Sequence, residues 1–154
     1  MPDCRTKYFE KMQYTADSVI RLPNGLPGFE QEREFVLIEQ PVHRPLVFVQ
    51  SLRTPDLCFA ALPVLSVDAA YRLFLSAEDL DLMGLDPSRQ PSIGSEVACL
   101  AIVAVGHDRE MTANLLSPLV INLSTCVAVQ GIQTGCHYSH RHPLLAEEPE
   151  PECS

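Results

Sequence analysis

The chain has 154 residues, which fits one domain of ordinary size and is short for two. With 46% hydrophobic and 20% charged residues it can build a buried core, so a disordered chain is excluded. Twenty acidic residues against eleven basic ones give a formal net charge of -9, and such a surface repels the phosphates of nucleic acids. We therefore expect no direct binding of RNA or DNA.

The N-terminal residues carry charges with no apolar run behind them, which is not the pattern of a signal peptide. The longest near-continuous apolar run, residues 97–105, is far shorter than the roughly 20 residues that cross a bilayer as a helix. We therefore expect a cytoplasmic protein without membrane contact. In that reducing compartment its six cysteines should stay thiols, and Cys58, Cys99 and Cys126 should act as small hydrophobic residues.

Prolines and glycines divide the chain into segments that are mostly too short for helices, which predicts a mainly β fold. Segments rich in Val, Ile, Phe and Tyr are the expected strands. They are residues 5–9, 19–22, 35–39, 46–52, 59–62, 71–75, 97–105, 112–116, 119–123 and 126–130. The segment 97–105 has no polar side chain to turn toward water, so it should be a central strand covered on both faces.

One short helix is predicted over residues 76–83, where Ser76 is a suitable N-cap and Asp79 follows three residues later. Gly84 can take the left-handed conformation that ends a helix. Further along, only Ser124 and Thr125 separate two predicted strands, which suggests a tight hairpin.

These elements together predict a small β-barrel-like single domain with one short helix, because closing a sheet removes its exposed edges. We place that domain at residues 1–145. The last nine residues, 146–154, are rich in Glu and Pro and are expected to form a disordered acidic tail.

A histidine-rich segment near the C-terminus offers the one enzyme-like pattern. His137, His140 and His142 follow Cys136, and imidazole and thiolate are preferred zinc ligands. In an extended chain, however, His137 faces the opposite side from the other two. A small metal-dependent enzyme is therefore the alternative to a solvated terminal strand, and we otherwise expect no cofactor and no catalytic residue.

The segment 22–30, LPNGLPGFE, is the most distinctive stretch of the chain. Pro23 and Pro27 fix φ, while Gly25 and Gly28 allow left-handed turns, so the segment should fold into a compact loop. Its apolar residues, Leu26 and Phe29, can either plug the core or anchor a partner. Both interpretations stay open.

Eight pieces of the sequence, in order from residue 6 to residue 144, resemble the flagellar assembly factor FliW family. They are TKYF (6–9), PNGLPGFE (23–30), FVL (35–37), QS (50–51) with PDL (55–57) and Phe59, LS (75–76) with DL (79–80), AIV (101–103), TANLLSPLVIN (112–122) and YSHRHPL (138–144). The chain departs from the family pattern at residues 105–110, in the hairpin around Cys126 and at His140.

The resemblance implies a non-catalytic protein switch. Such a factor binds flagellin and, in exchange, binds and antagonises the carbon storage regulator CsrA, a basic protein that represses flagellin translation. The acidic composition agrees with a basic partner. The partner-binding residues that we expect on this basis are Leu26, Phe29, Asn114 and Arg141, with Glu147, Glu148, Glu150 and Glu152 of the tail.

Overall fold

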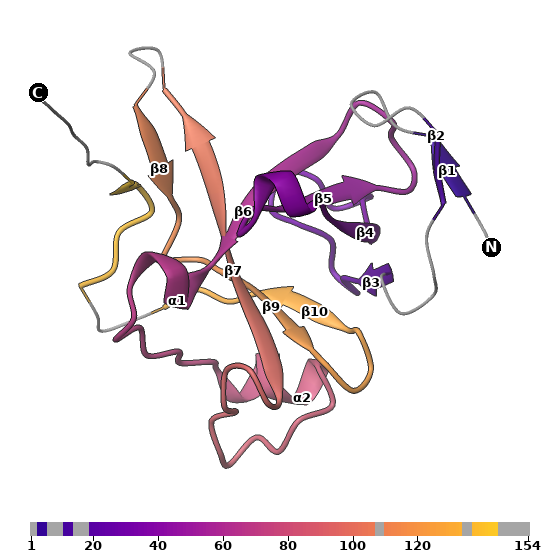
Figure 1. Cartoon of the computed structure of the whole chain (residues 1–154). Coiled ribbons are helices and arrows are strands. Elements are labelled where there is room, and N and C mark those ends of the chain that lie inside the picture. Colours follow the sequence, from indigo (N-terminus) through magenta and orange to yellow (C-terminus); the bar gives the residue numbers. More distant parts are fainter. Residues whose placement is uncertain (1–2, 6–10, 14–18, 107–109, 134–136, 145–154) are drawn as a thin grey trace, which may run out of the picture.

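The computed structural model describes residues 3–5, 11–13, 19–106, 110–133 and 137–144 (Figure 1). Two short strands near the N-terminus, β1 (Asp3–Arg5) and β2 (Lys11–Gln13), pair with each other as a separate antiparallel hairpin. The strand predicted over residues 5–9 shares only Arg5 with β1, and its other residues lie outside the described ones.

A nine-stranded antiparallel sheet makes up the body of the protein. Its strands are β3 (Val19–Arg21), β4 (Glu34–Glu39), β5 (Val47–Ser51), β6 (Cys58–Pro63), β7 (Val97–Val105), β8 (Met111–Ala113), β9 (Leu119–Asn122), β10 (Ala128–Gln130) and β11 (His142–Pro143). Seven of them follow the order β10-β9-β7-β6-β5-β4-β3, while β8 joins β7 to β11 as a branch.

The two ends of this path approach each other at one place. Arg21, the last residue of β3, forms an isolated parallel bridge with Val127, and its N–H donates to the Cys126 carbonyl at 2.9 Å. No further ladder between described residues closes the sheet into a barrel. The predicted mainly β single domain is confirmed, with a sheet that stays open.

The central strand is β7, as predicted. It pairs with β6 and β9 along its first part and with β8 at its end, and it crosses the middle of the molecule (Figure 1). Its side chains alternate between two buried clusters, since Cys99 and Ala101 enter one and Leu100 enters the other. The end of the strand is not covered by other side chains, because Val105 is 65% exposed.

The predicted short helix is confirmed as α2 (Ala77–Leu82). The Ser76 hydroxyl accepts a hydrogen bond from the Asp79 N–H at 3.1 Å, and Gly84 follows with φ +79°. Leu80 and Met83 are fully buried against the sheet. The prediction of a single helix was wrong, because α1 (Val64–Val67) forms directly after Pro63 and a 3-10 helix spans Pro41–His43.

The strand predicted over residues 71–75 was also wrong, because this segment joins no ladder. Its backbone bonds to glutamine side chains instead. Phe74 N–H donates to Gln133 Oε1 at 2.7 Å and Gln133 Nε2 donates to the Phe74 carbonyl at 2.8 Å. Gln90 makes the same pair of bonds with Leu75, at 2.8 and 2.9 Å.

The hairpin of β9 and β10 is confirmed, but its turn is longer than the two residues predicted. Ile121 pairs with Ala128, and the Asn122 N–H donates to the Val127 carbonyl at 2.9 Å, so residues 123–126 form the loop. Cys126, the last residue of this loop, has a φ of +63°, a left-handed conformation that its residue type does not predict. Within the described ranges, the structure contains no helix with the length and hydropathy of a membrane span.

Candidate partner-binding surface

The connection between β3 and β4, residues 22–33, is a compact loop closed by its own backbone, hereafter the β3–β4 loop. At its base the Leu22 N–H donates to the Arg33 carbonyl at 2.8 Å, and near its tip the Phe29 N–H donates to the Leu26 carbonyl at 2.7 Å. Gly25 and Gly28 have φ of +68° and +83°, as the sequence predicts. The loop is therefore ordered by local turns.

Gly25 is required by space as well as by conformation. A Cβ at this position would lie 2.5 Å from the Glu30 carbonyl oxygen, whereas a Cβ on Gly28 would meet nothing within 4 Å. Across the tip, the Gly28 N–H donates to the Glu30 carboxylate at 3.0 Å, and this hydrogen bond is the main reason that the pKa of Glu30 lies below its usual value. The tip is thus fixed by a close backbone approach and by one carboxylate.

The two apolar residues of the loop have different surroundings. Leu26 is 3% exposed and belongs to the core cluster of Ile20 and Phe35, so it offers a partner almost no surface. Phe29 is 43% exposed, and its ring contacts Phe59 edge-on with 5.8 Å between centroids. The burial favours the core interpretation for Leu26 and leaves Phe29 as the loop's accessible aromatic side chain.

A second loop, residues 52–57 between β5 and β6, clamps the β3–β4 loop from the side. The Glu32 carboxylate accepts hydrogen bonds from the Ser51 and Thr54 hydroxyls. Burial raises the pKa of Glu32, but these two hydrogen bonds and the Arg53 charge outweigh it, so that the pKa is lowered overall. A carboxylate therefore holds the two loops together.

Gln50 supports this clamp from the interior. It is fully buried, and its Nε2 donates to the carbonyls of Ser51, Thr54 and Pro55 at 3.0 to 3.4 Å. The sequence singled out Gln50 and Ser51 only as a motif and gave them no role. Glu32, the partner of the Ser51 and Thr54 hydroxyls, was missed altogether, since these contacts span about twenty residues of chain and no local pattern marks them.

Two concavities flank the β3–β4 loop. One of about 250 Å³ lies between the loop tip, α2 and β10, and is lined among others by Pro27, Glu30 and Leu82. The other, of about 440 Å³, lies at the base of the loop, between it and residues 52 and 53. The loop with its exposed Phe29 therefore stands between two hollows, a shape that suits docking of a partner.

Asn114 and Arg141 lie in a different place, where β8 and β11 pair. Asn114 Oδ1 accepts from the N–H groups of Leu116 and Ser117 at 3.1 and 2.9 Å, which ends β8 before the predicted boundary of residue 116. The Leu115 N–H donates to the Ser139 carbonyl, so the segment that carries exposed Arg141 runs alongside. The predicted residues thus form two groups, and the acidic tail lies outside the described residues.

Among the described residues, which do not include Cys136, the histidines of the alternative metal site form no cluster with other ligands. His137 and His140 are exposed and His142 lies in β11, and the parts of the chain that the structure describes hold no group of three metal-ligating side chains. Burial also raises the pKa of the Cys99 thiol to about 12 and that of Cys58 to about 11. Both thiols are protonated at neutral pH and are poor nucleophiles or ligands.

Comparison with known proteins gives consistent results. The family model described as FliW protein matches residues 3–144. The flagellar assembly factor FliW of Syntrophomonas wolfei is 33% identical over 136 residues, covering 88% of this chain and 83% of the relative. The Bacillus subtilis protein of the same name is 27% identical over 143 residues, which cover 92% and 96% of the two chains. A crystal structure of the flagellar assembly factor FliW superposes with a TM-score of 0.80 at 29% identity, over 94% of this chain and 98% of the other.

Proposed function

The chain belongs to the FliW family of flagellar assembly factors, and from this premise we propose that it binds flagellin and, in exchange, binds and antagonises the carbon storage regulator CsrA. Free flagellin would occupy the factor, and export of flagellin would release it to bind the regulator. Translation of flagellin would then resume. We place this exchange in the cytoplasm, where flagellin is made.

The observation that carries the proposal is a preorganised loop with an exposed aromatic side chain. Binding costs less when the contact residues are already held in place, and aromatic residues are frequent anchors of protein interfaces. The β3–β4 loop meets both conditions, because its backbone is closed by hydrogen bonds and Phe29 is 43% exposed. We assign the apolar contact with flagellin to this loop.

The charge of the chain supports the second partner. A net charge of -9 attracts a basic RNA-binding protein and raises the cost of bringing RNA near the complex. Glu147, Glu148, Glu150 and Glu152 would contribute mainly to the encounter rate, because a flexible segment must be ordered before it adds to the bound state.

Binding rather than catalysis also suits the ionisable groups. A general acid at neutral pH needs a carboxyl with a raised pKa. Among the described residues, each carboxyl with a shifted pKa is shifted downward, namely Glu30, Glu32, Asp86 and Glu96. These groups are arranged as hydrogen-bond acceptors that hold loops, and we propose no reaction for them.

A competition experiment tests the exchange. The purified full chain is bound to immobilised carbon storage regulator, and flagellin is then added at increasing concentration. We expect both proteins to bind the chain and flagellin to displace the regulator. Failure of either partner to bind, or a stable complex of all three, contradicts the proposal.

The role of the tail is tested by a salt series. Truncation after Leu145 should lower the association rate with the regulator at low salt and have less effect at high salt, because exposed charges are screened over about 8 Å at physiological ionic strength. Flagellin binding should survive the truncation. An unchanged rate toward the regulator at every salt concentration excludes a role for the tail.

A further inference from the structure

The 440 Å³ concavity at the base of the β3–β4 loop is basic, although the protein is strongly acidic. Arg21, Arg33 and Arg53 line it, from β3, the loop base and the loop after β5. They are three of only eleven basic residues in the chain. Three separate segments therefore bring scarce positive charge to one hollow.

Two of these arginines are held in place by backbone carbonyls. Arg33 Nε donates to the Glu30 carbonyl at 3.3 Å and Arg53 Nη1 donates to the Gln31 carbonyl at 3.2 Å. A guanidinium has five N–H donors, so most of its donors stay available after one such bond. The loop thus orients the two groups without neutralising them.

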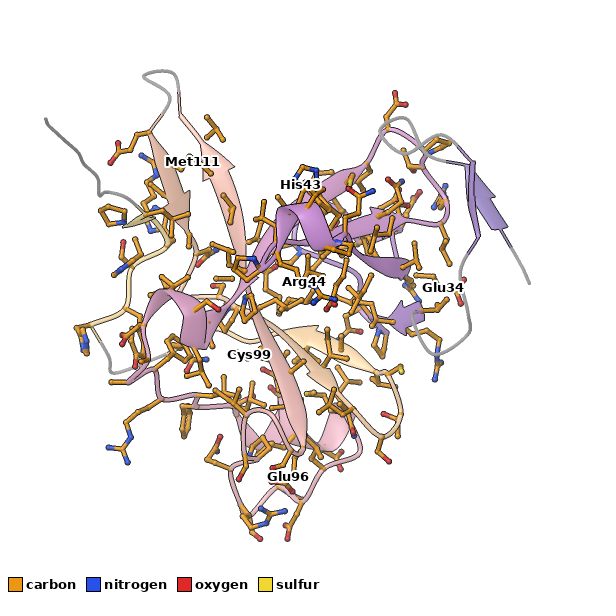
Figure 2. The ribbon with its side chains drawn as sticks, viewed as in Figure 1. Glu34, His43, Arg44, Glu96, Cys99 and Met111 are labelled. Atoms are coloured by element: carbon orange, nitrogen blue, oxygen red, sulfur yellow. The ribbon has the colours of Figure 1, made fainter. Side chains whose placement is uncertain are left out.

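The nearby carboxylates do not cancel the charge. Glu34, which Figure 2 labels, is the one acidic residue in the lining and lies opposite Arg21 in the β3–β4 register. The ion pair found between described residues is a different one, Arg89 with Glu96. Even when Glu34 and also Glu32, on whose carboxylate the Arg53 charge acts, are set against the three arginines, the basic side chains remain in excess.

The floor of the concavity is apolar. Leu22, Pro23 and Leu52 line it together with the arginines; Pro23 and Leu52 are half-buried and keep surface for a ligand, whereas Leu22 is almost fully buried. Guanidinium groups bind carboxylates through paired hydrogen bonds, and an apolar floor receives a neighbouring aliphatic or aromatic side chain. A ligand with a carboxylate next to an apolar group matches both features.

We propose that this concavity binds a segment of a partner protein that carries an acidic residue beside an apolar one. The three arginines that line it are all exposed, whereas a small molecule is normally enclosed on most of its surface. A nucleic acid would bring a row of phosphates against the acidic remainder of the molecule. The site goes beyond the exchange proposed above, because the basic regulator is the wrong charge for it and flagellin is assigned to Phe29.

The test uses the full chain with isotope-labelled arginine side chains and a synthetic probe peptide, Gly-Leu-Glu-Glu-Leu-Gly. We expect the Nε–Hε signals of Arg21, Arg33 and Arg53 to shift on titration, while that of Arg72 stays in place. The double variant Arg33→Gln/Arg53→Gln should lower the affinity for the peptide by about tenfold or more, since each lost charge-assisted hydrogen bond contributes strongly to binding. Arg72→Gln, an exposed arginine on another segment, is the matched control and should bind normally.

Three control ligands, a lysine peptide, free glutamate and inorganic phosphate, can each contradict the proposal. A peptide with lysines in place of the glutamates should not bind, and equal binding of it overturns the proposal. Free glutamate or inorganic phosphate that shifts the same signals at the same concentration as the peptide shows a small-anion site instead, which also overturns it. Because the titration of the unmodified protein maps the site directly, it decides the outcome even if the double variant unfolds.

Discussion

The β3–β4 loop and the segment 71–75 satisfy their backbone hydrogen bonds in opposite ways. Both are stretches without a neighbouring strand along much of their length, and both must satisfy backbone hydrogen bonds. The loop uses its own turns, with Gly25 and Gly28 in left-handed conformations. The segment uses side chains from elsewhere, with Gln133 bonded to Phe74 and Gln90 bonded to Leu75.

The contrast continues in how each region is anchored. The segment 71–75 is held by long-range contacts, since Tyr71 donates to the Leu115 carbonyl at 2.6 Å and its ring stacks on Tyr138 at 4.3 Å. The Tyr138 hydroxyl accepts from the Arg72 N–H at 2.8 Å. Order in the loop therefore depends on local conformation, whereas order in the segment depends on residues 15 to 67 positions away.

The largest expected effect on stability comes from a substitution that disturbs the local turns of the β3–β4 loop. Gly25→Ala should lower the free energy of unfolding by about 2 to 5 kcal/mol, because it adds a left-handed strain to an overpacked contact with the Glu30 backbone. Gly28→Ala is the matched control, with only the strain of about 1 to 2 kcal/mol. Denaturant unfolding of the two variants measures both, and equal losses would show that the close approach at Gly25 does not matter.

The long-range hydrogen bonds to segment 71–75 are removed by Gln133→Met, which keeps the side-chain volume and removes the amide. Gln133 is 3% exposed, and its loss strands the N–H and the carbonyl of Phe74, so we expect a loss of about 2 to 4 kcal/mol. Gln90→Met removes the same pair of part-buried bonds from the backbone of Leu75, but Gln90 itself is exposed, so the side from which its amide reaches Leu75 is open to water and the expected cost is about 1 kcal/mol. Thermal unfolding compares the two, and a larger loss for Gln90→Met would contradict this order.

The smallest effect concerns the surface contact beside Gln90. Arg89 makes two hydrogen bonds to Glu96, which Figure 2 labels, at 3.1 and 2.6 Å, and these, followed by the hydrogen bond from the Ser92 N–H, lower the pKa of Glu96 to about 2. A depressed carboxyl pKa stabilises the fold above its ordinary value of about 4.5, and that contribution disappears as pH falls through 2. Arg89→Gln should raise the pKa of Glu96 in a carbon-detected NMR titration. An unchanged pKa would show that Arg89 is not its main cause.

The two regions also explain how far the sequence predicts this fold. Glycine and proline carry their conformational preferences with them, so the β3–β4 loop could be predicted from nine residues. The helix α2 was equally predictable, since Ser76, Asp79 and Gly84 act locally. The segment 71–75 has the composition of a strand, and only tertiary contacts with Gln90 and Gln133 replace its ladder.

The candidate site follows the same division. Phe29 was singled out because it sits in a locally defined loop, and the structure leaves it exposed. Glu32, whose carboxylate joins two loops, and the convergence of Arg21, Arg33 and Arg53 were missed. Each depends on which distant strands become neighbours, and that information is spread over the whole sheet.

The central claim is that the β3–β4 loop presents Phe29 to a partner while Leu26 holds the loop to the core. The most direct test measures stability and partner affinity together for Phe29→Ala and Leu26→Ala. Phe29→Ala should lower the free energy of unfolding by about 1 kcal/mol or little more, because the ring is only partly buried. The same variant should weaken the binding of flagellin by more than about tenfold. Leu26→Ala should cost about 2 to 5 kcal/mol and leave the affinity of the folded protein nearly unchanged. A Phe29→Ala variant that is both stable and fully binding would contradict the claim.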